Sequence, residues 1–193
     1  MDLSAHPCFD AAARHEHSRA HLPVATGCNV QCNYCDRRFD CANEARPGLA
    51  SKILTPSQAA AYVDELRTAD PTLSVVGIAG PGDPLANPEV TLETLRRVRE
   101  RNPGLLLCLA TNGLALPAHL DALVSLRVGH VTVTVNAVDP EIAARIYAWV
   151  REGGNRRTGR AAGEVLWRAQ AAGIRALSEI GRASCRERVF SSV

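Results

Sequence analysis

Three cysteines fall within eight residues, in the order Cys28-Asn-Val-Gln-Cys32-Asn-Tyr-Cys35. Thiolates are soft ligands that select zinc, cuprous copper or iron–sulfur clusters. A structural zinc site takes four closed ligands, usually from two cysteine pairs, and this C-x3-C-x2-C spacing does not supply them. The spacing instead favours a 4Fe–4S cluster with one iron left open to a small molecule. The alternative is a zinc site that Cys41 or a histidine completes.

The remaining cysteines are Cys8, Cys41, Cys108 and Cys185. Cys41 follows the motif in a polar loop, where burial explains it poorly, whereas Cys108 lies in the apolar run LLLCLA and could be a small buried hydrophobe. Cys8 is ambiguous on its own. The chain begins without the basic and apolar regions of a secretory signal, so we expect a cytoplasmic protein whose cysteines bind metal or act in catalysis.

Length and composition exclude several classes of protein. The chain has 193 residues, of which 46% are apolar and 22% charged, values typical of one folded domain or of a domain and a fragment. The formal charge is +2, aromatic residues make up 4%, and no run of like charge stands out. We therefore expect neither a nucleic-acid nor a membrane surface.

Apolar runs alternate with helical patterns along the chain. Strands are expected at 22–26, 73–79, 105–110 and 130–136, and long loops at 27–50 and 151–160. Helices are expected from Pro56 (after a Thr55–Gln58 capping box) to 69, from Asn87-Pro88 to 102, at 117–126, from Asp139-Pro140 and at 161–173. Continuous apolar strands that alternate with helices predict an α/β fold with a parallel sheet, either barrel-like or doubly wound.

The unusual residues cluster after these expected strands. The cysteine motif follows the first strand, Gly80-Pro81-Gly82-Asp83 the second, and Thr111-Asn112-Gly113 the third. In both architectures the loops at the carboxyl ends of parallel strands build the site. The three segments are therefore expected to meet.

The cysteine motif in this position resembles that of the radical S-adenosylmethionine (SAM) enzymes. In that superfamily the open iron chelates the amino and carboxylate groups of SAM. One electron from the cluster then cleaves the sulfonium to a 5′-deoxyadenosyl radical. The resemblance implies a partial TIM-type (βα)6 barrel, truncated here to about four βα units.

Residues 6–178 further resemble the NifB family of SAM-dependent maturases. The segments that carry the resemblance are HPCFD, HLPVA, CNVQCNYC, FDCANEARPG, VVGIAGPGDPLANPE, LCLATNGLALP, HVTVTVNAVDPEI and IYAWVR. The family fuses two 4Fe–4S units and inserts a SAM-derived carbide, which gives the eight-iron precursor of the nitrogenase iron–molybdenum cofactor. The resemblance thus implies residues 1–21 as an N-terminal cluster-ligand segment and 22–178 as an incomplete radical SAM core.

The resemblance also implies metal ligands. Cys28, Cys32 and Cys35 would hold the SAM-cleaving 4Fe–4S cluster. The first substrate cluster would take three ligands, namely His21, Cys41 and Cys108. The second would take Cys8 and two cysteines of a C-terminal C-x2-C motif that this chain lacks.

SAM itself needs further contacts, and the candidates are Tyr34, Gly80, Gly82, Asp83, Thr111, Asn112 and Asn136. The glycine loop would present backbone to the methionine amino group, although a plain tight turn explains GPGDP as well. The polar residues after strands three and four would bind the carboxylate and ribose, and Tyr34 would lie beside adenine. Glu44 is the candidate catalytic group for the methyl or carbide precursor, with pairing to Arg37 or Arg38 as its alternative.

Other function classes stay open at this stage. A different radical SAM enzyme, such as a glycyl-radical activase or a heterocycle synthase, is the first alternative, and a non-catalytic zinc or iron–sulfur module is the second. The expected partners of the maturase are SAM, an iron–sulfur cluster donor, a cofactor-carrier protein and a reductant protein.

The final stretch resembles the translation of a common sequencing adapter, from Glu179 to Val189. We predict that residues 179–193 are an artefact, the alternative being a natural arginine-rich tail. With four strands the sheet would expose an open edge, so we expect the chain as written to fold poorly and not to complete carbide insertion.

Overall fold

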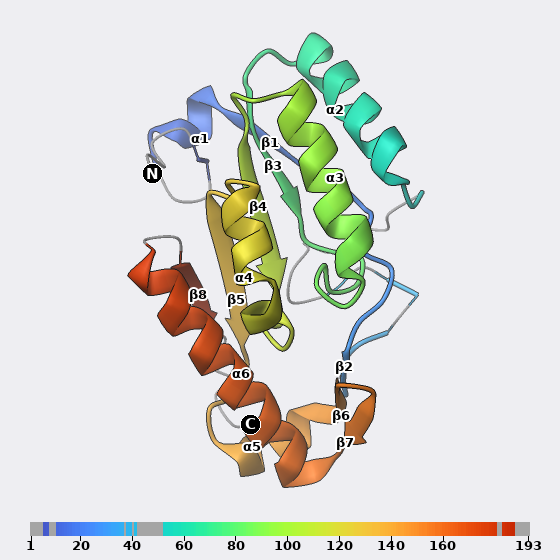
Figure 1. Cartoon of the computed structure of the whole chain (residues 1–193), viewed down its shortest axis with the longest axis vertical. Helices are drawn as coiled ribbons and strands as arrows, with labels where there is room; N and C mark the ends of the chain where they lie inside the picture. The colour runs from blue at the N-terminus through green and yellow to red at the C-terminus, as the bar shows by residue number, and fades with distance from the viewer. Residues whose placement is uncertain are drawn as a thin grey trace.

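The computed structural model describes residues 6–7, 11–36, 38–39, 41, 52–180 and 183–187. The predicted roles of Cys8 and Glu44 lie outside these residues. The fold is α/β, as predicted, and its main sheet is entirely parallel (Figure 1). The strands lie in the order β1 (Ser18–His21), β3 (Leu73–Ile78), β4 (Leu106–Thr111), β5 (His130–Val135) and β8 (Ala183–Glu187). This arrangement is part of a βα barrel.

The first strand begins earlier than predicted. It spans Ser18–His21, preceded by the short helix α1 (Ala13–Glu16), whereas the apolar run 22–26 lies entirely after it. Leu22 still donates to the Gly77 carbonyl at 2.9 Å, but Pro23 has no N–H to continue the ladder. Ala25 then forms an isolated parallel bridge with Pro81. The prediction of the first strand at 22–26 is therefore wrong: the strand ends at His21, and residues 22–26 lead from it into the cysteine motif.

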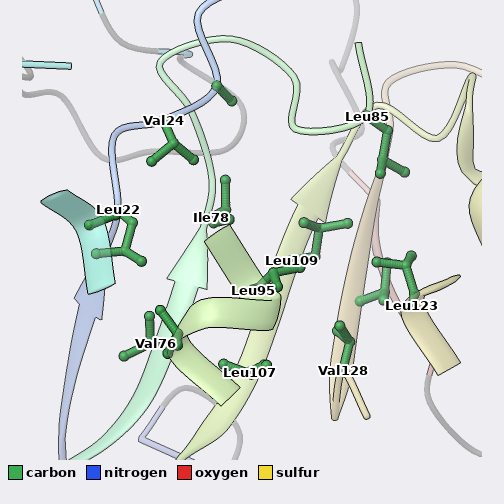
Figure 2. Packing of buried hydrophobic residues seen from close by; sticks show 14 of the residues in the cluster. Leu22, Val24, Val76, Ile78, Leu85, Leu95, Leu107, Leu109, Leu123 and Val128 are labelled. Carbon is green, nitrogen blue, oxygen red and sulfur yellow. The ribbon is translucent and has the colours of Figure 1, made fainter. Parts of the chain in front are cut away.

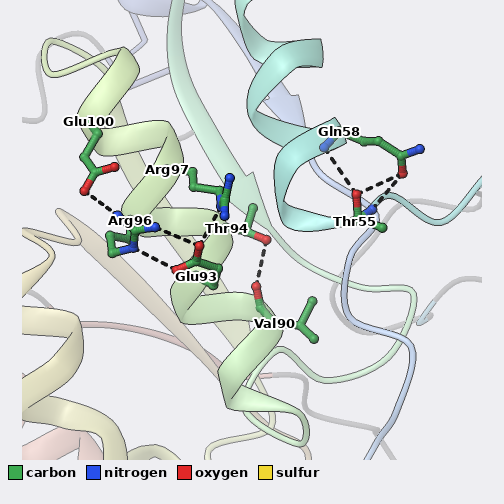
Figure 3. Close-up of polar contacts among 8 residues, drawn as sticks. All are labelled: Thr55, Gln58, Val90, Glu93, Thr94, Arg96, Arg97 and Glu100. Carbon is green, nitrogen blue, oxygen red and sulfur yellow. Dashed lines mark hydrogen bonds and ion pairs between the residues drawn. The ribbon is translucent and has the colours of Figure 1, made fainter.

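Four helices pack on one face of the sheet: α2 (Pro56–Ala69), α3 (Pro88–Arg101), α4 (Leu116–Ser125) and α6 (Gly159–Glu179). The capping box predicted for α2 is present, since Gln58 N–H donates to Thr55 Oγ1 at 3.3 Å and Thr55 N–H donates to Gln58 Oε1 at 3.0 Å (Figure 3). On α3, Arg96 bonds Glu93 and Glu100, one helical turn to either side. These pairs are exposed and contribute little stability.

The core lies between this face and the helices (Figure 2). Every second residue of β4 and β5 points into it, and Leu107, Leu109, Val131 and Val133 are almost fully buried. Burial of each such side chain contributes about 1.5–3 kcal/mol. The alternation places Cys108 on the opposite, inner face of the sheet.

A second, three-stranded sheet consists of β2 (Val30–Cys32), β6 (Tyr147–Glu152) and β7 (Asn155–Arg157). The prediction of a loop at 151–160 is wrong, because β6 and β7 form a hairpin around Gly153-Gly154. Both glycines have positive φ, 54° and 83°, as a two-residue hairpin turn requires. The Gly-Gly pair was the sequence signal for this hairpin.

The carboxyl-terminal elements are longer than predicted. Helix α5 (Pro140–Ile146) begins after the N-cap Asp139, as expected, and α6 (Gly159–Glu179) extends beyond the predicted 161–173 on both sides. Strand β8 then pairs in parallel with β5, from Val131↔Ala183 to Val135↔Glu187. In this structure the sheet edge that was expected to be open is therefore covered by part of the segment 179–193.

Candidate functional site

A cavity of about 250 Å³ opens where the cysteine motif meets the ends of the parallel strands. All three motif cysteines and Cys41 line it. The other lining residues come from the loops after β1 and β3, the end of β4 and the cysteine loop: Thr26, Val30, Tyr34, Phe39, Ile53, Pro81, Gly82, Asp83 and Asn112. The predicted meeting of three loops at one site is thus present in the fold.

The loop after β3 backs directly onto the start of the cysteine loop. Gly82 N–H donates to the Ala25 carbonyl at 2.5 Å, and Asp83 N–H donates to the Gly27 carbonyl at 2.7 Å. A Cβ on Gly82 would lie 2.0 Å from the Gly27 carbonyl oxygen, so only glycine allows this approach. Both N–H groups are therefore used in hydrogen bonds within the protein. Gly80, with φ of 142°, forms the bend before them.

Asp83 is buried, 2% exposed, and its carboxylate joins the loop after β3 to the end of β4. It accepts from Leu85 N–H at 2.9 Å, from Asn112 N–H at 2.6 Å and from the Thr111 hydroxyl at 2.9 Å. Burial raises the pKa of Asp83, and the hydrogen bonds from Asn112, Leu85 and Thr111 oppose that rise. Its side chain therefore holds two loops together.

The Thr111 hydroxyl lies inside the fold. Thr111 is 0% exposed, donates its hydroxyl proton to Asp83 and accepts from Gly113 N–H at 3.1 Å. Thr111 was predicted to contact SAM; in this structure its hydroxyl bonds Asp83, and Thr111 is not among the residues that line the cavity.

Asn112 reaches the cysteine motif from the end of β4. Its side-chain nitrogen lies 3.6 Å from the Cys28 sulfur and donates to Asn29 Oδ1 at 2.7 Å. Its side-chain oxygen accepts from Leu114 N–H at 2.9 Å. The amide is thus fixed by neighbours on both sides, with one N–H directed at a cysteine sulfur.

Asn136 bonds Tyr34, one of the residues that line the cavity. Asn136 Nδ2 donates to the Tyr34 hydroxyl oxygen at 2.7 Å. The side-chain oxygen of Asn136 is buried and, among the residues that the structure describes, has no hydrogen-bond partner. A buried acceptor without a donor is costly, so this atom is suited to a donor that a ligand supplies, such as a ribose hydroxyl.

The four cysteines of the cavity are half-buried. Burial raises the pKa of Cys32 to about 12, a hydrogen bond with Tyr34 opposes the rise, and neighbouring Cys28, Cys41 and Cys35 add to it. The Cys32 thiol therefore stays protonated at neutral pH until a metal displaces its proton.

Within the described ranges, no three Cys, His, Asp or Glu side chains are placed to share one metal ion. A 4Fe–4S cluster makes a different demand, because each thiolate binds a separate iron around its outside. Three thiols on the wall of one cavity fit that donor set. Cys28, Cys32 and Cys35 could therefore hold such a cluster.

Two ligands predicted for the first substrate cluster lie side by side on the inner face of the sheet. His21 pairs in register with Gly77, and Gly77 with Cys108. A Cβ on Gly77 would lie 3.2 Å from His21 Cδ2 and 3.6 Å from Cys108 Cβ. The third, Cys41, lines the cavity with the motif cysteines, 3.9 Å from a Cβ built on Gly80.

Sequence reasoning missed three buried polar residues around the site. His130 pairs in register with Cys108, and its ring centroid lies 5.7 Å from that of His6. Burial lowers the pKa of each of these histidines to about 4. On α6, Gln170 donates to the carbonyls of Asn112 at 2.8 Å and Thr134 at 3.0 Å. The signal for Gln170 was a polar residue on the apolar side of a predicted helix.

Comparison with known proteins places this geometry in context. Residues 22–181 match the family model described as "Radical SAM superfamily". The chain is 53% identical over 181 residues to "FeMo cofactor biosynthesis protein NifB" of Chlorobaculum tepidum, covering 94% of this chain and 43% of that protein. It is 55% identical over 178 residues to the protein of the same name from Klebsiella pneumoniae, covering 92% and 38%. The chain thus spans less than half the length of these relatives.

A solved structure shares the fold. "Native anSMEcpe with bound AdoMet" superposes with a TM-score of 0.56 at 15% identity, covering 88% of this chain and 43% of that one. In the described part of the chain, no helix combines the length and apolarity that a bilayer span requires.

Proposed function

This chain belongs to the radical SAM superfamily, and we propose that it is the SAM-cleaving part of a maturase of the NifB type. The observation that carries the proposal is the cavity on which Cys28, Cys32 and Cys35 meet Gly82 and Asn112. A 4Fe–4S cluster held by the three cysteines would supply the electron that cleaves SAM to methionine and a 5′-deoxyadenosyl radical.

The chain's own residues would bind and orient SAM. The loop from Gly80 to Gly82 contributes Pro81 and Gly82 to the cavity wall. Its close contact with Gly27 would keep this backbone beside the cysteine motif. The unpartnered oxygen of Asn136 would accept from a ribose hydroxyl, and Tyr34, held by Asn136, would lie beside adenine. Asp83 and Thr111 would position this wall from behind.

The substrates would be two 4Fe–4S units, fused around a carbide that derives from a SAM methyl group into an eight-iron product. His21 and Cys108, which flank Gly77, and Cys41 would hold the first unit. Cys8 would contribute to the second. This pair of donors on the inner face favours the maturase over an activase or heterocycle synthase, which needs no second cluster ligand set there.

The proposed reaction would use two molecules of SAM in different ways. Methyl donation from one SAM would yield S-adenosylhomocysteine, and radical cleavage of a second would yield 5′-deoxyadenosine and methionine, a lyase-like reaction. Glu44 would act on the methyl or carbide precursor. A cluster donor, a carrier for the product and a reductant protein would be the protein partners.

The test is anaerobic reconstitution of the chain with iron and sulfide, followed by SAM and dithionite. We expect 5′-deoxyadenosine by chromatography, and we expect it to fall to background in Cys32→Ala, which removes one ligand of the SAM-cleaving cluster. Zinc in place of iron and sulfide, or product formation that survives in Cys32→Ala, would overturn the proposal.

A further inference from the structure

The hairpin of β6 and β7 carries three exposed arginines that have no part in the proposed chemistry: Arg151, Arg156 and Arg157. Among the described residues, none of the three takes part in an ion pair. By contrast, Arg160, just after the hairpin, pairs with Glu141 and Glu164. The hairpin therefore carries three arginines against one exposed acid, Glu152, and no described ion pair neutralises the arginines.

Two of these charges face each other directly. Arg151 and Arg156 are register partners in the antiparallel pair of β6 and β7, an arrangement in which like charges are destabilising. Both guanidinium groups lie over the ring of Trp149, at 5.3 Å and 5.4 Å from its centroid. Cation–π attraction offsets part of the repulsion and fixes both cations on one surface. A costly arrangement held in place in this way is suited to binding an anionic partner.

This basic surface adjoins the strand that carries the cysteine motif (Figure 1). Trp149 pairs in register with Gln31, and Arg151 N–H donates to the Asn29 carbonyl at 2.8 Å. Gln31 in turn donates from its side chain to the carbonyls of Cys32 at 3.0 Å and Cys35 at 3.3 Å. Trp149, over which both cations lie, is therefore the register partner of Gln31, whose side chain bonds the backbone of two motif cysteines.

We propose that the surface formed by Trp149, Arg151 and Arg156 docks an acidic protein that carries single electrons. The inference rests on the proposed function, which needs one external electron for each SAM cleaved. In the transfer, the reduced carrier loses one electron and is oxidised, and the cluster gains that electron and is reduced. Opposite charge on the two proteins would speed their encounter and make it sensitive to salt. Arg157 on the same hairpin adds to the attraction.

The test uses the full chain, reconstituted anaerobically, and an acidic plant-type [2Fe–2S] ferredoxin as probe. Binding is measured by calorimetry at low and at high salt. We expect Arg151→Glu/Arg156→Glu to weaken ferredoxin binding by roughly tenfold or more, and salt to weaken wild-type binding. The matched control is Arg14→Glu/Arg175→Glu, which makes the same charge change at exposed arginines of α1 and α6 and should stay within about twofold of wild type.

Two further measurements separate docking from folding and from the proposed function. Arg151→Lys/Arg156→Lys should retain binding, and 5′-deoxyadenosine formation with dithionite, which needs no docking protein, should be the same in wild type and in the glutamate variant. Absence of product with dithionite in every variant would overturn the proposed function, while the binding data still decide the docking surface. Equal binding by wild type and the glutamate variant, no binding by wild type, or tighter binding to RNA or anionic vesicles than to ferredoxin would overturn the docking proposal.

Discussion

The side-chain nitrogen of Asn112 lies 3.6 Å from the sulfur of Cys28 and donates a hydrogen bond to it. Asn112 stands at the end of β4, 84 residues from Cys28 along the chain. The bond therefore joins the third parallel strand in sequence to the cysteine motif. Hydrogen bonds to cluster sulfurs raise the reduction potential, because they stabilise the more negative reduced state.

Replacement of Asn112 by leucine should lower the reduction potential of the reconstituted cluster. Loss of one hydrogen bond of about 1 kcal/mol corresponds to roughly 40 mV for a one-electron couple. A redox titration followed by electron paramagnetic resonance measures the shift. Asn33→Ala is the control, since it removes an amide that bonds the Arg145 carbonyl and leaves Cys28 untouched. Equal potentials in Asn112→Leu and wild type would show that this bond does not tune the cluster.

Gly82→Ala should destabilise the protein severely. The new Cβ would lie 2.0 Å from the Gly27 carbonyl oxygen, so one of the two backbones must move. We expect a loss of at least about 2–4 kcal/mol in the free energy of unfolding, measured by urea titration. Gly104→Ala is the matched control, because its Cβ would meet no atom within 4 Å. Similar unfolding midpoints for the two variants would contradict the close approach seen here.

Asp83 should make stability depend on pH in an unusual direction for a carboxylate. Burial raises its pKa, so the folded state holds the proton at pH values where the unfolded state has released it. The contribution of Asp83 is then full below its unfolded pKa of about 3.8 and falls as pH rises through the folded pKa.

The measurement compares wild type with Asp83→Asn, which does not titrate, in urea titrations from about pH 4 to about pH 8. Asparagine offers one acceptor where Asp83 uses both oxygens, so the variant should be less stable by roughly 1–3 kcal/mol. The advantage of wild type over the variant should shrink as pH rises. An advantage that grows with pH would mean that the pKa of Asp83 is lowered.

Gln170→Leu should destabilise the fold by roughly 1–3 kcal/mol, because it leaves the carbonyls of Asn112 and Thr134 without this donor. It should also weaken SAM binding, since Asn112 would lose one of its supports. Arg168→Leu, an exposed position on the same helix, provides the control for apolar substitution on α6. Calorimetry of SAM binding and thermal unfolding check both effects. If Gln170→Leu unfolds and binds SAM as wild type does, the residue has no positioning role.

Much of the fold was predictable because its signals are local. The capping box at Thr55 and the cap at Asp139, which accepts from Glu141 N–H at 2.7 Å, are set by residues next to one another in sequence. The first strand and the hairpin at 151–160 were predicted wrongly for different reasons. The apolar run at 22–26 follows the strand that pairs with β3 instead of forming it. The segment 151–160 is rich in arginine and glycine, as loops are, and becomes a hairpin because β6 pairs with both β2 and β7.

The location of the candidate site was predictable from the sequence, but the hydrogen bonds within it were not. Strand order alone brings the cysteine motif, Gly82 and Asn112 to one end of a parallel sheet. Which atoms then meet depends on tertiary packing. Thr111 turns inward to Asp83, and Gln170 reaches Asn112 from a helix 58 residues later, contacts that no local pattern encodes.

The central claim is that SAM binds at the open fourth iron of a 4Fe–4S cluster whose other three irons are held by Cys28, Cys32 and Cys35. Electron–nuclear double resonance tests it on the reduced, reconstituted chain mixed with SAM that carries nitrogen-15 in its amino group. The account predicts a resolved coupling between the cluster and that nitrogen, and loss of the coupling in Cys28→Ala. A reduced cluster that shows no coupling to the labelled nitrogen would contradict it.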